Sequence, residues 1–293
     1  MIDRKKREGN IMIHERIDLY GYFRLPRGEK AKGYLDAYAQ GQNPELPEKT
    51  RPAMIVAPGG GYQFLSEREK DPVAARFFAE GYAAFTLEYS IDTAYPVPLV
   101  EACMAVAYVR ENAEKYGVDK EHVCVVGFSA GGHLVGMLAT LFGDDAVKRA
   151  LGERNVRPDA VILSYAVITA DPRIWHSGSI ETISGGNADL KKKLSLEKCV
   201  KKDSAPAFIW HTFEDDGVPV KNSVLMADAY ASAGVPFELH VFEKGPHGLS
   251  VATVETAAGE NDDRLINENA GMWVPLSLNW LKKRGFKVVA AKK

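Results

Sequence analysis

The sequence lacks the features that mark membrane, nucleic-acid-binding and secreted proteins. No run approaches the roughly 18 apolar residues that a membrane-spanning helix needs, and the net charge is only −2 at pH 7. We therefore expect neither a membrane nor a nucleic acid as a partner. The charged residues 1–10 contain no apolar core of a secretory signal, so we expect them to form a flexible, solvated tail on a cytoplasmic protein.

Cysteine is also scarce. The three cysteines, Cys103, Cys124 and Cys199, are an odd number and do not have the spacing of metal ligands. Cys103 falls in a helical pattern and Cys124 in an apolar run, so we expect both to be buried and reduced. The sequence also contains no His-Glu-x-x-His, Gly-x-Gly-x-x-Gly or P-loop motif. We therefore predict neither a metal nor a cofactor.

What is present is an alternation of short apolar runs with helical patterns. Strands are expected at residues 16–22, 33–38, 54–57, 83–89, 122–126, 160–165, 207–212 and 237–242. Helices are expected at residues 72–80, 99–116, 130–141, 220–233 and about 272–284. The first two strands are expected to form an antiparallel pair at the edge. The alternation predicts the α/β class, with a doubly wound and mostly parallel sheet.

We expect residues 1–293 to form one domain. Residues 41–51 are rich in Pro, Glu and Asn, which is typical of a surface loop. Residues 166–206 show no consistent period, and within them residues 177–187 are rich in turn formers. We interpret residues 166–206 as a small cap-like insertion that partly covers the sheet edge.

The segment Gly127-Phe128-Ser129-Ala130-Gly131 has the Gly-x-Ser-x-Gly form of a nucleophile elbow. It follows an apolar β-branched run and precedes a helical pattern, which is the context that such an elbow requires. Ser129 is therefore the candidate nucleophile, on a sharp turn between a strand and a helix. Glycine at positions 127 and 131 removes side chains that would collide across this turn.

A serine nucleophile needs a base, and the base needs a carboxylate to orient it. On this fold the expected chain order is serine, acid, histidine. His247 lies in a Gly-Pro-His-Gly turn directly after the last expected strand, so it is the candidate base. Three adjacent carboxylates, Glu214, Asp215 and Asp216, follow the preceding strand and compete for the role of the acid.

An acyl-transfer site also needs N–H donors aimed at the oxyanion. We expect one donor to be the backbone N–H of Ala130, at the start of the elbow helix. A second is expected from the glycine run after the strand at residues 54–57, either at Gly60 or at Gly61. Tyr62, which follows this run, and His133, one turn beyond the nucleophile, are expected to bind the substrate.

The remaining histidines are less suited to the role of the base. His211 ends an expected strand, and we expect it to pack or to form hydrogen bonds locally. His176 shows no pattern of partners in the sequence.

With these residues in place, the chain resembles the α/β-hydrolases. More narrowly, it resembles the branch that contains acetylxylan esterases and related carbohydrate esterases, close to prolyl-oligopeptidase-like hydrolases. The matching segments run through most of the chain. They are Pro58-Gly59-Gly60-Gly61-Tyr62, Tyr95-Pro96-Val97-Pro98-Leu99, residues 127–134, Trp210-His211-Thr212, Asp215-x-x-Val218-Pro219-Val220, Gly245-Pro246-His247-Gly248-Leu249 and Trp280-Leu281. In that family the catalytic aspartate precedes x-x-Val-Pro, which implies Asp215 as the acid.

The resemblance implies a serine esterase with a triad of Ser129, His247 and Asp215 and an acyl-enzyme intermediate. Its expected substrates are short-chain esters, acetyl esters in particular, of xylo-oligosaccharides or other sugars. The absence of a secretory signal favours short oligosaccharides over polymeric xylan. The alternatives are a general carboxylesterase for small esters, a prolyl-oligopeptidase-like peptidase and a binding protein that has lost catalysis. The expected partner is thus a small-molecule or oligosaccharide ester, and the composition is compatible with a homo-oligomer.

Overall fold

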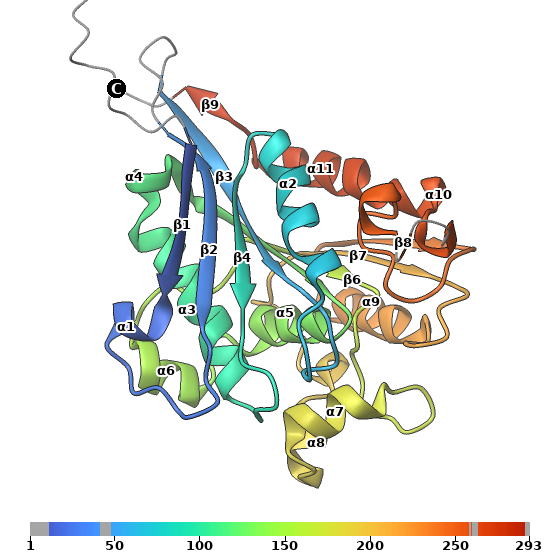
Figure 1. Cartoon of the computed structure of the whole chain (residues 1–293). Coiled ribbons are helices and arrows are strands. Elements are labelled where there is room, and N and C mark those ends of the chain that lie inside the picture. The colour runs from blue at the N-terminus through green and yellow to red at the C-terminus, as the bar shows by residue number, and fades with distance from the viewer. Residues whose placement is uncertain (1–11, 42–47, 258, 260–262, 291–293) are drawn as a thin grey trace, which may run out of the picture.

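The computed structural model describes residues 12–41, 48–257, 259 and 263–290. The tail expected at residues 1–10 and most of the loop expected at residues 41–51 therefore lie outside the described residues. A twisted sheet with the strand order β1-β2-β4-β3-β5-β6-β7-β8 runs through the centre (Figure 1). Its strands are β1 (Met12–Asp18), β2 (Tyr34–Gln40), β3 (Lys49–Ala57), β4 (Ala83–Glu88), β5 (Val118–Phe128), β6 (Ala160–Ser164), β7 (Ala207–Thr212) and β8 (Phe237–Phe242).

The sheet is mostly parallel, as the sequence predicts. β1 and β2 pair in an antiparallel manner, with Ile13 opposite Ala39, and β2 is antiparallel to β4. All other neighbouring pairs along this order are parallel. The short strand β9 (Val289–Ala290) adds an antiparallel pairing to β3. An antiparallel edge on a parallel sheet is common in doubly wound folds, and it confirms the expected edge pair.

Helices cover both faces of the sheet because neighbouring residues of a strand point to opposite sides. In β3, Met54 and Val56 belong to one core cluster, whereas Ile55 and Ala57 belong to the other. The first cluster includes residues of α2 (Asp71–Ala79) and α11 (Trp273–Lys283). The second includes residues of α3 (Val97–Glu111), α5 (Ala130–Leu141) and α9 (Lys221–Ala233). Burial on both faces explains why the central strands are continuous apolar runs.

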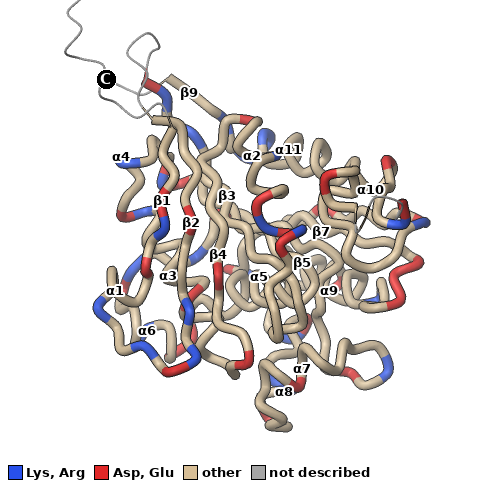
Figure 2. The backbone as a smooth tube through the Cα atoms, viewed as in Figure 1, with Lys and Arg blue, Asp and Glu red and all other residues tan. Residues whose placement is uncertain are grey.

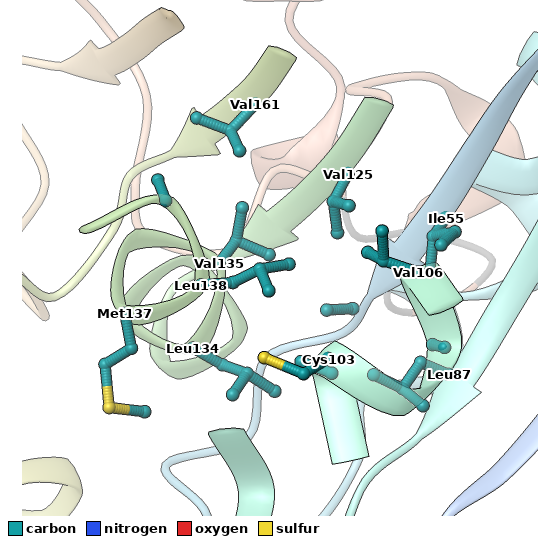
Figure 3. Close-up of a cluster of buried hydrophobic side chains, with 14 of the residues drawn as sticks. Ile55, Leu87, Cys103, Val106, Val125, Leu134, Val135, Met137, Leu138 and Val161 are labelled. Carbon is teal, nitrogen blue, oxygen red and sulfur yellow. The ribbon is translucent and has the colours of Figure 1, made fainter. Parts of the chain in front are cut away.

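Figure 3 shows the core between the sheet and the helices α3 and α5. The apolar side chains of the two helices pack against those of the central strands and of β4. The residues labelled there are Ile55, Leu87, Cys103, Val106, Val125, Leu134, Val135, Met137, Leu138 and Val161, all with at most 1% of their surface exposed. The expected burial of Cys103 and Cys124 is confirmed, since both have no exposed surface. This packing holds α5 against the end of β5, where Ser129 lies.

Two expected elements end earlier than the sequence suggests. The strand expected at residues 16–22 stops at Asp18, whose side chain accepts a hydrogen bond from Gly21 N–H and caps the short helix α1 (Leu19–Phe23). The helix expected at residues 99–116 is split at Asn112 into α3 and α4 (Ala113–Tyr116). There the amide of Asn112 donates to the carbonyl of Tyr108, and such local bonds compete with helix continuation.

Residues 166–206 contain more regular structure than their lack of period suggests. They form α7 (Ser177–Ser184), where the sequence indicates turns, and α8 (Ala188–Lys193), where the sequence shows no consistent period. Both helices are too short to show a period, and each is capped by a side chain, α7 by His176 and α8 by Asn187. Figure 1 shows α7 and α8 beyond the carboxyl ends of the parallel strands.

Further short helices connect these elements. They are α6 (Asp145–Leu151), α10 (Glu268–Gly271) and the 3-10 turns at Glu67–Glu69, Leu196–Lys198, Val254–Thr256 and Asp263–Leu265. Lys and Arg are interspersed with Asp and Glu over the backbone (Figure 2). Among the helices of the described residues, none combines the length and the apolar character needed to cross a bilayer.

Candidate active site

Ser129 occupies a strained turn between β5 and α5. Its backbone has φ 52° and ψ −115°, a conformation that non-glycine residues rarely adopt and that is typical of functional turns. The flanking glycines make the turn feasible. A Cβ at Gly127 would lie 2.2 Å from the carbonyl oxygen of Gly131, and a Cβ at Gly131 would lie 2.3 Å from the carbonyl oxygen of Ala57. The strand, turn and helix thus have the backbone geometry that a nucleophile elbow requires.

Three loops bring Ser129, His247 and Asp215 into one hydrogen-bonded chain. His247 Nε2 lies 2.8 Å from Ser129 Oγ, and His247 Nδ1 lies 2.7 Å from Asp215 Oδ2. The three residues follow β5, β8 and β7 respectively, so they meet at the carboxyl ends of parallel strands, where reactive groups of such sheets gather. The structure therefore joins the three side chains that the sequence names as a triad.

Of the three competing carboxylates, only Asp215 reaches His247. Its side chain is buried, and Oδ1 accepts hydrogen bonds from the N–H groups of Gly217 and Val218. Glu214 and Asp216 are exposed, and Glu214 pairs with Lys244 on the surface.

Burial opposes the ionisation of Asp215, but hydrogen bonds from His211 and His247 outweigh it and hold the pKa of this carboxyl well below its usual value. Burial also opposes protonation of His247, yet the hydrogen bond and the charge of Asp215 raise its pKa above the ordinary imidazole value. An ionised Asp215 accepts the Nδ1–H of His247. This tautomer leaves Nε2 free to accept the proton of Ser129.

Three backbone N–H groups near Ser129 are available for an oxyanion. Within the described residues, the amides of Gly60, Gly61 and Ala130 have no hydrogen-bond partner, whereas the N–H of Gly59 donates to Glu69. Gly60 and Gly61 have φ values of 125° and 66°, which favour glycine. The carbonyl of Gly60 accepts from the N–H groups of Gln63 and Phe64, so the loop is folded back on itself. Free backbone N–H groups of this kind are what an oxyanion site needs.

The BD-FAE family model matches residues 40–230 of this chain. The chain belongs to the BD-FAE family. The match includes the glycine loop, the elbow and Asp215, whereas His247 lies beyond it.

The chain is also similar to two named proteins over 71% of its length. The chain is 41% identical over 217 residues to endo-1,4-beta-xylanase B of Butyrivibrio fibrisolvens, a match covering 71% of this chain and 34% of that protein. It is 31% identical over 219 residues to the acetylxylan esterase of Xylanibacter ruminicola, and this match covers 71% of this chain and 43% of that protein. The chain thus spans less than half of the length of these two relatives.

Solved structures match over much more of their length. The acetyl ester-xyloside bifunctional hydrolase of Caldicellulosiruptor lactoaceticus superposes with a TM-score of 0.73 at 33% identity, covering 86% of this chain and 88% of that one. The carboxylesterase Cest-2923 of Lactobacillus plantarum superposes with a TM-score of 0.79 at 27% identity, covering 96% of this chain and 99% of that one. The chain therefore has the α/β-hydrolase fold.

Tyr62 and His133 do not line this site, contrary to expectation. Both side chains are fully buried. His133 Nε2 lies 2.9 Å from the carbonyl oxygen of Leu194 and so carries the proton, and the hydroxyl of Tyr62 donates to His133 Nδ1 at 2.9 Å. Burial lowers the pKa of His133 to about 4, which keeps the ring neutral. The pair connects the glycine loop, α5 and residues 166–206, and it leaves no polar atom for a substrate.

Glu69 is a site residue that the sequence does not reveal. Its side chain is buried, with Oε2 accepting from Gly59 N–H at 2.8 Å and Oε1 accepting from the hydroxyl of Tyr165 at 2.6 Å. The ring of Tyr165 packs edge-on against His247, with centroids 5.1 Å apart. Glu69 thus connects the glycine loop to the base. In the sequence it stands among charged residues that look like a solvated surface.

The described residues contain no group of three or more His, Cys, Asp or Glu side chains placed to hold a metal ion.

Proposed function

We propose that this chain is a serine esterase that removes short acyl groups, acetyl in particular, from xylo-oligosaccharides or other sugars. The observation that carries the proposal is the hydrogen-bonded chain from Ser129 through His247 to Asp215, beside unpaired N–H groups. The names of two matched proteins, an acetylxylan esterase and an acetyl ester-xyloside hydrolase, support an acetylated sugar as the substrate.

The geometry supports a two-step reaction. His247 Nε2 takes the proton of Ser129 as Oγ attacks the ester carbonyl. The oxyanion is stabilised by the N–H of Ala130 and by that of Gly60 or Gly61. His247 then gives the proton to the leaving sugar oxygen, and an acyl-enzyme remains on Ser129. Water hydrolyses the acyl-enzyme by the reverse proton transfers, while Asp215 holds His247 in the reactive tautomer throughout.

His176 is the side chain of residues 166–206 that we assign to substrate binding. Its Nδ1 accepts the N–H of Ser179 at 3.2 Å, so the proton of the neutral ring is on Nε2, which has no partner among the described residues. Cε1, the neighbour of Nε2 in the ring, lies 3.9 Å from the point where a Cβ of Gly61 would be. Burial and the charge of His247 lower the pKa of His176. A neutral N–H donor therefore lies beside the oxyanion loop, where it can bind a sugar hydroxyl.

The first test of the proposal is Ser129→Ala, assayed with p-nitrophenyl acetate. We expect turnover to fall by about four orders of magnitude or more, because the nucleophile is removed and the oxyanion donors alone supply little catalysis. The exposed Ser232, on α9, provides the control, and Ser232→Ala is expected to leave the rate unchanged. A Ser129→Ala chain with near-normal rates would refute the proposed nucleophile.

Substrate assays on the wild-type chain distinguish the competing functions. The proposal expects hydrolysis of acetylated xylobiose and a preference for C2 over C8 p-nitrophenyl esters. A preference for C8 would favour a general carboxylesterase, and cleavage of a proline amide would favour a peptidase. A failure of organophosphates to label Ser129 would indicate a binding protein without catalysis.

The role of His176 is tested with His176→Asn, since asparagine is a good helix N-cap and preserves the start of α7. We expect kcat/KM on acetylated xylobiose to fall about 3- to 10-fold, the effect of one lost hydrogen bond. The rate on p-nitrophenyl acetate, whose leaving group carries no sugar hydroxyl, should change less than about twofold. Equal losses on both substrates would contradict a role in binding the sugar.

A further inference from the structure

The carboxylate that orients the base also contacts a second histidine. His211, in β7, has Nε2 3.2 Å from Asp215 Oδ2, the same oxygen that lies 2.7 Å from His247 Nδ1. The side chains of His211 and Asp215 have no exposed surface. The proposed reaction does not use His211, because its ring contacts neither Ser129 nor any of the unpaired N–H groups among the described residues.

The surroundings of His211 determine which nitrogen carries its proton. Nε2 lies 2.8 Å from the carbonyl oxygen of Val218, which can only accept, so Nε2 must be the donor. Nδ1 lies 2.7 Å from Ser223 Oγ on α9, and the serine hydroxyl can donate to it. A neutral ring with Nε2–H satisfies both contacts. The ring is therefore held in one orientation, with its N–H directed to Val218 O and with Nε2 3.2 Å from Asp215 Oδ2.

We propose that His211 is a positioning residue that acts on the reaction through Asp215. Its Nε2–H and the N–H groups of Gly217 and Val218 hold the carboxylate so that Oδ2 faces His247. By accepting from two imidazoles, Asp215 shares its negative charge between them, which limits how strongly it stabilises a protonated His247. The inference rests on the proposed roles of Ser129, His247 and Asp215, and it adds a fourth side chain to them.

This charge sharing determines the direction in which the loss of His211 moves the acid limb of the pH profile. Without the His211 donor, Asp215 interacts more strongly with His247, so the protonated form of His247 persists to higher pH. The other titratable groups that act on His247 are Glu69 and Asp216, and the ring of His176 also faces it. The variants below leave all three in place.

The test compares His211→Phe with His211→Gln. Phenylalanine fills the space of the ring without a donor, whereas the amide of glutamine can place an N–H near the position of Nε2. For His211→Phe we expect kcat on p-nitrophenyl acetate to fall about 10- to 100-fold, with little change in KM. We also expect the acid limb of its kcat/KM profile to move to higher pH. His211→Gln should recover most of the rate and return the limb towards that of the wild type.

A purely structural role would predict a different result, namely a lower Tm for both variants and no movement of the limb. That result, or a His211→Gln chain no better than His211→Phe, would overturn the inference. If His211→Phe does not fold, Ser223→Ala tests the same ring orientation without touching His211. It should lower kcat about two- to fivefold and move the limb in the same direction, and an unmoved limb would again overturn the inference.

Wild type and Ser129→Ala are measured in the same assay to separate this inference from the proposed function. A Ser129→Ala chain that stays active would refute the proposed function, and the His211 inference with it. An inactive Ser129→Ala chain together with a limb that His211→Phe leaves in place would refute the His211 inference alone.

Discussion

Glu69→Gln is the most informative single substitution, because Glu69 connects the glycine loop to Tyr165, whose ring packs against His247. Its two oxygens accept from Gly59 N–H and from the hydroxyl of Tyr165, and the oxygen of Tyr165 accepts from Ser250 N–H at 2.9 Å. A glutamine can keep the first bond through its oxygen. Its NH₂ group then faces the hydroxyl of Tyr165, whose proton loses its acceptor.

The loss of one buried hydrogen bond to a carboxylate costs about 2 kcal/mol. For a chain of this size, with an unfolding entropy of about 0.6 kcal/mol per kelvin, that corresponds to a drop in Tm of roughly 3 °C. The neutral amide oxygen also holds Gly59 less strongly than the carboxylate does, next to the N–H groups of Gly60 and Gly61, so we expect kcat to fall about tenfold or more. Thermal unfolding and steady-state rates on p-nitrophenyl acetate measure the two effects.

The pH profile tests the electrostatic part of the argument. His247 acts as a base only when it is neutral, and its pKa lies above the ordinary imidazole value. Wild-type activity should therefore decline as the pH falls through a value above roughly 6.5. The negative charge of Glu69 contributes to this raised pKa. Its removal lowers the pKa, so the acid limb of Glu69→Gln should move to lower pH, opposite to the shift expected for His211→Phe.

The matched control is Glu67→Gln, two residues away in the same 3-10 turn. The side chain of Glu67 is 74% exposed and pairs only loosely with Lys70, at 3.6 Å, so the substitution should change stability by less than about 0.5 kcal/mol. If Glu69→Gln matches Glu67→Gln in Tm, in kcat and in the position of the acid limb, the reasoning about Glu69 is wrong.

Two further substitutions test the triad and the elbow. Asp215→Asn should lower kcat by about four orders of magnitude, because an amide donates to His247 Nδ1 and favours the tautomer that cannot take the proton of serine; a loss below about tenfold would contradict this. Gly131→Ala should destabilise the chain by about 3 kcal/mol or more, since its Cβ would lie 2.3 Å from two backbone oxygens. Gly143, where a Cβ meets nothing within 4 Å, is the control, and equal urea midpoints for Gly131→Ala and Gly143→Ala would refute the steric argument.

The sequence by itself determined those features that depend on neighbouring residues. The helix over Ala130–Leu141 and the strands Ala207–Thr212 and Phe237–Phe242 have the predicted bounds, because periodicity and flanking glycines act over one or two turns of chain. Gly234 ends α9 with φ 68°, as a helix-terminating glycine is expected to do. Ser129 could be identified for the same reason, since the elbow requires glycine at fixed short distances from it.

Tertiary structure decided which side chains meet. The residues in contact at the site are far apart in the chain, as Ser129 and His247 are by 118 positions, and no local pattern encodes such a pairing. Among adjacent Glu214, Asp215 and Asp216, residue types alone left the acid open, and only the folded loops bring Asp215 to the base. Tyr62 and His133 appeared to face the substrate, but packing turns them inward. Burial, and not spacing, gives Glu69 and His211 their partners, because hydrogen bonds to buried groups depend on elements packed from elsewhere in the fold.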